Sequence, residues 1–443
     1  MRGATKGRSW WLSLVALLAV LALVAAACGG DDEEGGGATG ATETGATGES
    51  APAEEEPVTL QWWLFGNFDE EAMIAAYQVD HPNVTIETTV AEFNDHHDAL
   101  TTAIAAGAGA PDIAVIEVGF MSRFLAQPDN FYNLLDFGAG ELEGNFLDWK
   151  WNAGLTGDGS SLIALGTDVG PMAMAYRVDL FEEAGLPTDR EEVAALWPTW
   201  EDFIAVGQQY VEATGKAFTD EESQIYNPIL NQTGEKYYSP DNELIYESNP
   251  TVRNAWDLTC EAIDAGIFLN VEPFSAEWNA PMTNGDFATL TAPSWMMGYI
   301  KGQAPDTEGL WDLAALPGGG GNWGGSFLAI PAQSENAQAA YDFIEWYTAP
   351  EQQLQVFQDV GNFPSAPSVY GDLGDLTDPF FNDAPYGQVY AAVAEANVPI
   401  YEGPDEGVIR SAFEAALDRV SNGEESCEEG WSSALDNIQR DVG

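Results

Sequence analysis

The chain has 443 residues, 72 of them acidic and 14 basic, with a formal net charge of −58 at pH 7. This charge excludes nucleic acid and anionic membrane surfaces as partners, because phosphate contacts need lysine and arginine. The acidic residues are scattered along the chain, which is typical of a solvated surface on a folded body. The length exceeds what one simple core accommodates and indicates two lobes or domains.

The N-terminal segment predicts export and lipid attachment. A basic start and an apolar run precede three alanines and Cys28, the order found in a secretory signal. The alanine–cysteine junction resembles the bacterial lipobox, in which the cysteine is acylated, so we expect a signal peptide over residues 1–27 and lipid on Cys28. A transmembrane anchor is the alternative, because the apolar run is nearly long enough to span a bilayer. Residues 28–56 are rich in Gly, Ala, Thr and Glu and predict a disordered tether.

The next segments alternate between the two kinds of secondary structure. Residues 58–63 predict a strand, 69–79 a helix, 84–90 a strand, 98–106 a helix and 113–116 a buried strand. This order is typical of a parallel α/β sheet with right-handed crossovers. Residues 220–254 follow no clear pattern, and no repeat of fixed period is present.

Two cysteines remain once Cys28 is assigned to lipid. Cys260 and Cys427 form an even pair in an oxidising compartment, which predicts a disulfide. Two free buried thiols are the alternative.

A set of motifs in a fixed order carries a family resemblance. They are residues 58–65, His-Pro-Asn-Val at 81–84, Gly-Ala-Pro-Asp-Ile at 109–113, the segments 167–187 and 197–203, Gly-Asp-Phe-Ala at 285–288 with Ala-Pro-Ser-Trp at 292–295, Ala-Leu-Pro-Gly-Gly at 315–319 with 324–331, and the helix 339–350. The set resembles family 1 extracellular solute-binding proteins, the sugar-binding subunits of ABC importers. It covers the chain from about residue 57 to the C-terminus.

The resemblance implies a fold and a role. It implies an α/β protein of two lobes, joined by hinge segments, that close on a sugar in the cleft between them. The first lobe would take residues 57–170 and 326–378, and the second 171–325 and 379–443. It also implies a monomer without enzymatic activity or cofactor, lipid-anchored on the extracytoplasmic face of the cell membrane. An ABC permease would recognise its closed form, and the segment 378–404 looks most like the branch handling plant-type oligosaccharides.

A sugar site needs aromatic faces for the rings and polar groups for the hydroxyls, placed at the carboxyl ends of strands. The candidates at such places are Trp63, Asn67, Asn94, Asp95, Glu117, Asp168, Trp295 and Trp323. Trp295 also matches a family position that stacks a sugar. Several candidates have structural alternatives: Asn94 and Asp95 as helix caps, Asp168 as a turn residue, and a Trp near a strand end as core. We assign Trp62 to the core and Trp63 to the cleft.

Other chemistries find little support in the sequence. The glycine run 318–321 lacks the Lys-Ser/Thr of a phosphate loop, and the adjacent His96 and His97 point in different directions without a third ligand. No nucleophile elbow or His-Glu-x-x-His motif is present. Two alternatives stay open: a secreted glycoside hydrolase, which requires two carboxylates converging in the cleft, and a binder of a polyamine or metal chelate, which for a polyamine requires acidic residues there.

Overall fold

The structure is a computed structural model that describes residues 56–271 and 273–442. The predicted signal peptide, Cys28 and nearly all of the predicted tether lie outside the described residues. Within the described residues, no helix combines the length and the apolar character needed to cross a membrane.

The first sheet has five strands in the order β2-β1-β3-β10-β4. They are β1 (Val58–Phe65), β2 (Val84–Ala91), β3 (Ile113–Glu117), β4 (Ala164–Gly166) and β10 (Ser326–Ala329). β1 is parallel to β2 and β3, which confirms the α/β prediction for this part of the chain, whereas β10 is antiparallel to both of its neighbours. On β1 the side chains of Leu60, Trp62 and Leu64 are fully buried and the alternate ones are not, so one face of the strand packs in the core.

The second sheet has four strands in the order β7-β8-β6-β9. They are β6 (Met172–Arg177), β7 (Ala217–Thr219), β8 (Phe287–Pro293) and β9 (Trp311–Ala314). β6 is antiparallel to β8 and β9, and β7 is parallel to β8. β6 and β8 are buried along their whole length, because apolar side chains pack on both faces of this sheet.

Segments that pair with each other connect the two sheets. β5 (Asp168–Val169) pairs antiparallel with β11 (Phe363–Pro364). Beside them, Pro171 bridges Asn322 in the glycine-rich run. Phe363, Val369, Tyr370 and Leu373 pack with the core of the second sheet. β11 belongs to the connection between the sheets, because it pairs with β5.

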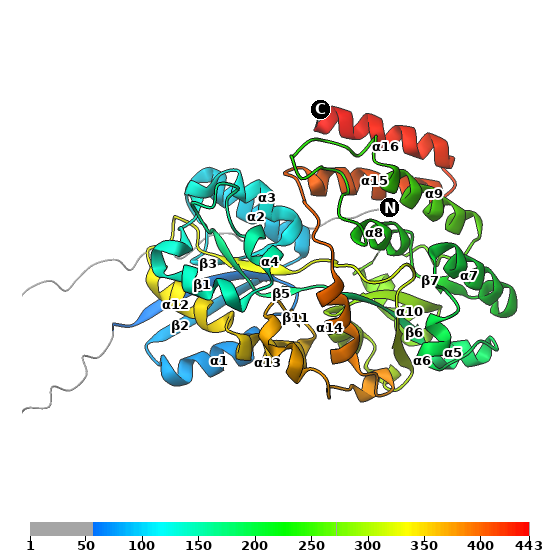
Figure 1. Cartoon of the computed structure of the whole chain (residues 1–443), viewed down its shortest axis with the longest axis horizontal. Coiled ribbons are helices and arrows are strands. Elements are labelled where there is room, and N and C mark those ends of the chain that lie inside the picture. The colour runs from blue at the N-terminus through cyan, green and yellow to red at the C-terminus, as the bar shows by residue number, and fades with distance from the viewer. Residues whose placement is uncertain (1–55, 272, 443) are drawn as a thin grey trace, which may run out of the picture. The chain divides into compact units, whose positions relative to one another are not determined.

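Sixteen α-helices surround the sheets in the described part of the chain: α1 (Glu70–Asp80), α2 (Phe93–Ala106), α3 (Val118–Leu125), α4 (Asp148–Ala153), α5 (Val178–Glu183), α6 (Arg190–Ala194), α7 (Trp200–Thr214), α8 (Ser223–Asn231), α9 (Pro250–Asp264), α10 (Ala276–Asn284), α11 (Met296–Gln303), α12 (Ala337–Tyr347), α13 (Pro350–Val360), α14 (Tyr386–Ala396), α15 (Glu406–Ser421) and α16 (Cys427–Asp441). Short 3₁₀ turns occupy Pro128–Asn130, Leu134–Phe137, Ala139–Asn145, Pro305–Thr307, Pro367–Asp372 and Pro379–Phe381. Figure 1 shows α9, α15 and α16 side by side, and their side chains share one apolar cluster with α7 and α8.

Helix α2 differs from the prediction. It begins at Phe93 and not near residue 98, and its N-cap is Glu92. The interpretation of Asn94 and Asp95 as caps is therefore wrong, because both lie in the first turn of the helix. The early start follows from His96 and His97, whose buried side chains give the first turns an inward face.

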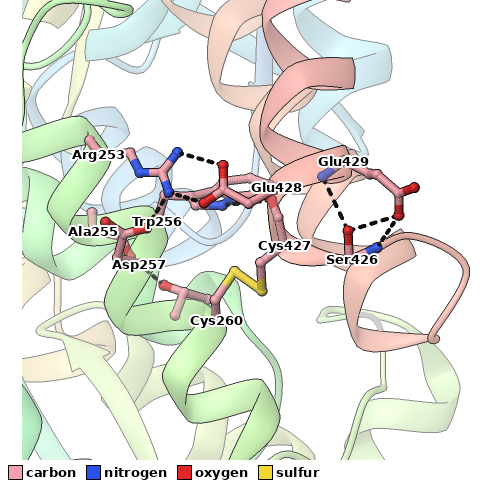
Figure 2. The surroundings of a disulfide bond; sticks show 10 residues. Arg253, Ala255, Trp256, Asp257, Cys260, Ser426, Cys427, Glu428 and Glu429 are labelled. Carbon is pink, nitrogen blue, oxygen red and sulfur yellow. Dashed lines mark hydrogen bonds and ion pairs between the residues drawn. A yellow bond between two sulfur atoms is a disulfide. The ribbon is translucent and has the colours of Figure 1, made fainter.

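A disulfide ties two of the C-terminal helices together. Cys260 of α9 is bonded to Cys427 at the start of α16, with 6.1 Å between their Cα atoms (Figure 2). Ser426 and Glu429 form a capping box at the same helix start, which satisfies backbone N–H groups that the first turn leaves unpaired. The bond thus joins helices that pack in the core of the second sheet.

Candidate functional site

A pocket lies where the carboxyl end of β3 meets the helices of the second sheet. Its lining residues come from β3, from α8 and the loop after it, from the glycine-rich connection 322–324, and from the first turns of α15 together with the segment before that helix. The polar lining groups are three amides (Asn227, Asn231, Asn322), three carboxylates (Glu117, Glu402, Glu406) and two cations (Lys236, Arg410). Trp323 supplies an aromatic ring. Both sheets therefore contribute residues to one polar site.

Glu117 forms the first-sheet side of this pocket. It is the last residue of β3, and its side chain caps α3 by accepting a hydrogen bond from the Gly119 backbone N–H at 2.8 Å. Burial, followed by the nearby Glu402 carboxylate, raises the pKa of Glu117 to about 7. A Cβ atom on Gly119 would lie 3.0 Å from Oε2 of Glu117 and 3.3 Å from Oε2 of Glu402. The two carboxylates thus converge over a glycine, and a larger residue there would crowd them.

Lys236 holds the carboxylates of the second-sheet side. Its Nζ lies 2.8 Å from Oε1 of Glu402 and 3.0 Å from Oε1 of Glu406. Burial disfavours the charged ammonium, but the two carboxylates outweigh it and raise the pKa of Lys236 above its usual value. Burial raises the pKa of Glu406, and the Lys236 ammonium partly offsets this increase. Lys236 is therefore a fixed cation between two acidic groups.

Arg410 is a second cation of the pocket, and its side chain is half-buried. Burial opposes its charge, but Glu414 and the pocket carboxylates outweigh this and raise its pKa. Three acidic and two basic side chains thus line the pocket. The arrangement presents hydrogen-bond donors and acceptors in fixed positions, which suits a ligand with many hydroxyl groups.

Behind the glycine-rich connection lies a buried lysine that the sequence did not single out. Lys150 of α4 is fully buried, and its Nζ lies 3.6 Å from the centroid of the Phe327 ring. No group in the described part of the chain accepts a hydrogen bond from this Nζ. Burial lowers the pKa of Lys150 to about 7, an effect that the nearby Asp168 opposes.

Asp168 supports the connection and does not line the pocket. Its Oδ1 accepts hydrogen bonds from the Ser326 backbone N–H at 2.9 Å and from the Thr167 hydroxyl at 2.7 Å. Burial raises the pKa of Asp168. These bonds fasten β5 to the start of β10, where the chain returns to the first sheet.

The two tryptophans of the second-sheet side are linked to each other. Trp323 lines the pocket, and its backbone N–H donates to the Gly170 carbonyl at 2.7 Å. Trp295 is half-buried, and its Nε1 donates to the Trp323 carbonyl at 3.1 Å. Trp295 therefore adjoins the pocket wall, and its ring lies 6.1 Å from the exposed Phe274.

The remaining predicted residues lie elsewhere. Trp62 is in the core as predicted, and Trp63 is half-buried in β1 without lining the pocket. Asn67 is exposed beyond β1, where its Oδ1 accepts a hydrogen bond from the Asp69 backbone N–H. Asn94 and Asp95 are exposed on α2. Of the eight predicted ligand residues, the pocket therefore brings together Glu117 and Trp323, with Trp295 beside them.

The adjacent histidines have structural partners. His96 Nε2 lies 2.7 Å from the Val115 carbonyl oxygen, and His97 Nε2 accepts a hydrogen bond from the Glu117 backbone N–H. Burial lowers the pKa of His97 to about 3, so its ring is neutral. Among residues 56–271 and 273–442, no cluster of His, Cys, Asp and Glu suitable for a metal ion occurs.

Sequence reasoning missed most of the second-sheet side of the pocket. Lys236 and the α8 residues belong to the stretch that showed no pattern, and Arg410 belongs to no motif. Glu402 lies in the segment 378–404, but nothing in that segment singled it out as a site residue. One signal was available: Asn227 and Asn231 are four residues apart, so on a helix they lie on the same face. Two amides on one face of a buried helix indicate a polar contact.

Paired connections join the two sheets, and residues from both sides line one polar pocket. This arrangement defines a two-lobed ligand-binding protein. The family model for bacterial extracellular solute-binding proteins matches residues 72–385, more than half of the chain. The protein therefore belongs to this family, which confirms the predicted resemblance and an extracytoplasmic location.

Named relatives and solved structures agree with this assignment. The chain is 26% identical over 325 residues to the arabinooligosaccharide-binding protein of Halalkalibacterium halodurans, covering 69% of this chain and 70% of that protein. It is 25% identical to the protein of the same name from Bacillus subtilis, covering 70% and 73%. A solved extracellular solute-binding protein of family 1 has 36% identity and a TM-score of 0.77 over 87% of this chain and 99% of that one.

A further structure supports the fold alone. The ABC transporter-associated binding protein of B. animalis subsp. lactis, solved with β-1,6-galactobiose, has 22% identity and a TM-score of 0.76 over 86% of this chain and 97% of that one. Together, these structures confirm the predicted two-lobed α/β fold.

Proposed function

We propose that this protein captures an oligosaccharide in the pocket between its two sheets and delivers it to an ABC transporter permease. The observation that carries the proposal is the convergence of amides, carboxylates, two cations and Trp323 from both sheets on one site. Such groups pair with sugar hydroxyls, and a tryptophan ring packs on the apolar face of a sugar. The names of the relatives, which bind arabinooligosaccharides, support this class of ligand.

We propose further that lipid on Cys28 anchors the protein to the extracytoplasmic face of the membrane. The small residues before Cys28 and the polar segment after it support this proposal. The tether would keep a monomeric receptor close to its permease. Mass spectrometry of the membrane-bound protein tests it: we expect a diacylated N-terminal cysteine, and an unmodified N-terminus contradicts it.

Binding without turnover is part of the proposal. Glu117 and Glu402 do converge, as a glycoside hydrolase would require. However, Oε2 of Glu117 already accepts a hydrogen bond from the Gly119 backbone N–H, and Oε1 of Glu402 accepts one from Lys236. Membership of a binding-protein family favours the same reading. A polyamine is disfavoured because Lys236 and Arg410 would repel it.

The test is a calorimetric titration with a panel of ligands, combined with chromatography of each mixture after prolonged incubation. The panel contains arabinooligosaccharides of two to six units, β-1,6-galactobiose, a maltooligosaccharide and spermidine. We expect one oligosaccharide class to bind with one site per protein and to be recovered intact. Cleavage products would indicate a hydrolase, and binding of spermidine alone would indicate a receptor for cations.

A further inference from the structure

A direct contact joins the two sides of the pocket. The Ser122 hydroxyl on α3, a helix of the first-sheet side, donates a hydrogen bond to the Glu402 backbone carbonyl. Glu402 belongs to the segment that leads into α15, which packs in the core of the second sheet. Near this contact, Oε2 of Glu117 and Oε2 of Glu402 both lie within 3.3 Å of the point that a Cβ atom on Gly119 would occupy. They are therefore close together only while the two sides are closed on each other.

The Glu402 carboxylate is incompletely satisfied in this position. Its Oε1 is held by Lys236, but its buried Oε2 has no hydrogen-bond partner in the described part of the chain. This is the oxygen that lies near Glu117 across Gly119. A proton on Glu117 would remove the repulsion between the two carboxylates.

Other charged groups face Glu117 without removing the repulsion. Lys236 and Arg410 act from the second-sheet side, but each is already engaged with other carboxylates. Lys150 acts from α4, and its own charge is disfavoured by burial. His97 on α2 is neutral, because burial lowers its pKa. Burial and Glu402 therefore prevail and raise the pKa of Glu117.

We propose that closure of the pocket takes up one proton on Glu117, beside the Glu402 carboxylate, so that acidic conditions favour the closed form. This inference rests on the proposed function for its consequence, which is tighter sugar binding at lower pH. It adds a regulatory property that capture of a sugar does not itself require.

The linkage between protonation and closure gives the sign and the size of the expected pH dependence. When the sides separate, Glu117 regains water and loses Glu402, so its pKa falls from about 7 towards the ordinary value of 4.5. The closed form then binds the proton more tightly than the open form. The contribution of protonation to closure is fully present below the open-form pKa of Glu117, and it is lost as pH rises through 7. Between pH 5.5 and pH 8 the closure equilibrium should change by up to about 30-fold.

Two measurements on the full chain test the proposal. The first follows the radius of gyration by small-angle X-ray scattering from pH 5 to 8 without sugar, and we expect compaction towards acid pH. The second titrates the tightest sugar of the panel at pH 6.5 in buffers of different ionisation enthalpy, which counts protons. We expect uptake approaching one proton per sugar, and affinity that falls at least tenfold from pH 5.5 to pH 8.

Variants separate the pair from general acidity. Glu117→Gln removes the carboxyl that takes up the proton and should abolish proton uptake. Glu402→Gln removes the repulsion but leaves the burial of Glu117, so it should reduce proton uptake and weaken the pH dependence. Glu182→Gln, on the exposed surface of α5, is the matched control and should behave as the wild type. If one of the two variants Glu117→Gln and Glu402→Gln fails to fold, the other still tests the proposal.

The outcomes distinguish the inference from the proposed function. Suppose that the protein binds no sugar, and that compaction at acid pH is lost in Glu117→Gln and weakened in Glu402→Gln. This result supports the proton-linked closure and refutes sugar capture. Sugar binding without proton uptake, unchanged in both variants, overturns the closure proposal and leaves sugar capture standing.

Discussion

Replacing Gly170 with alanine should destabilise the connection between the sheets. Gly170 lies between β5 and β6, where its carbonyl accepts from the Trp323 N–H and its own N–H donates to the Asn322 side chain at 2.8 Å. A Cβ atom at this position would lie 1.8 Å from the Trp323 carbonyl oxygen. Ordinary contacts require roughly twice that separation, and the obstacle is backbone, which cannot rotate away as a side chain can.

The magnitude follows from these contacts. Overpacking of a tight site costs about 1–3 kcal/mol. Separating the two segments also weakens both hydrogen bonds of Gly170, at about 1 kcal/mol each. We therefore expect Gly170→Ala to lower the free energy of unfolding by about 3–5 kcal/mol. Urea denaturation followed by tryptophan fluorescence and circular dichroism measures it.

Gly302→Ala provides the matched control. Gly302 is exposed in α11, and a Cβ atom there would meet nothing within 4 Å. Alanine is the better helix former, so this variant should be unchanged or more stable by up to about 1 kcal/mol. A loss below about 1 kcal/mol in Gly170→Ala, equal to the control within error, would refute the close approach of the two segments.

Three further predictions concern other parts of the molecule. Replacing both Cys260 and Cys427 by serine removes a link between residues 167 positions apart, so the free energy of unfolding in urea should fall by about 3–5 kcal/mol. Reductant added to the wild-type protein should lower the free energy of unfolding by the same amount, and a different effect of reductant would contradict this prediction. Trp323→Ala should weaken sugar binding at least tenfold in calorimetry, whereas Trp63→Ala, outside the pocket, should not; equal losses would argue against the site. Burial raises the pKa of Asp220 to about 7, so the folded state holds a proton that the unfolded state releases above pH 4, and stability falls as pH rises from 4 through 7. In Asp220→Asn the loss of unfolding free energy between pH 5 and pH 8 should be about 1–3 kcal/mol smaller than in the wild type, and an unchanged loss would exclude this assignment.

The sequence predicted the first sheet well because its pattern is local. The alternation of Leu60, Trp62 and Leu64, and the apolar run of β3, are signals that neighbouring residues carry by themselves. The start of α2 was missed because His96 and His97 are polar by type yet buried in this fold. The hydrogen-bond partners of their ring nitrogens make that burial favourable, and two of these partners, the Val115 carbonyl and the Glu117 N–H, come from β3.

The pocket was only partly predictable, for a different reason. Glu117 could be placed because the carboxyl end of a buried parallel strand is a ligand position in many α/β folds. Its partners Lys236 and Glu402 lie more than a hundred residues away, and they meet Glu117 only through tertiary packing. Lys236 lies in a segment without a motif, and nothing in the segment 378–404 singles out Glu402. In a chain with 72 acidic residues, no local pattern marks the few that are buried.

The most direct test of sugar capture is a crystal structure of the protein with the tightest oligosaccharide of the panel. We predict one sugar chain between the two sheets, with hydroxyls paired to Glu117 and Asn231 and a ring against Trp323. A sugar bound elsewhere on the surface, with this pocket still closed on its own side chains, would contradict the proposal.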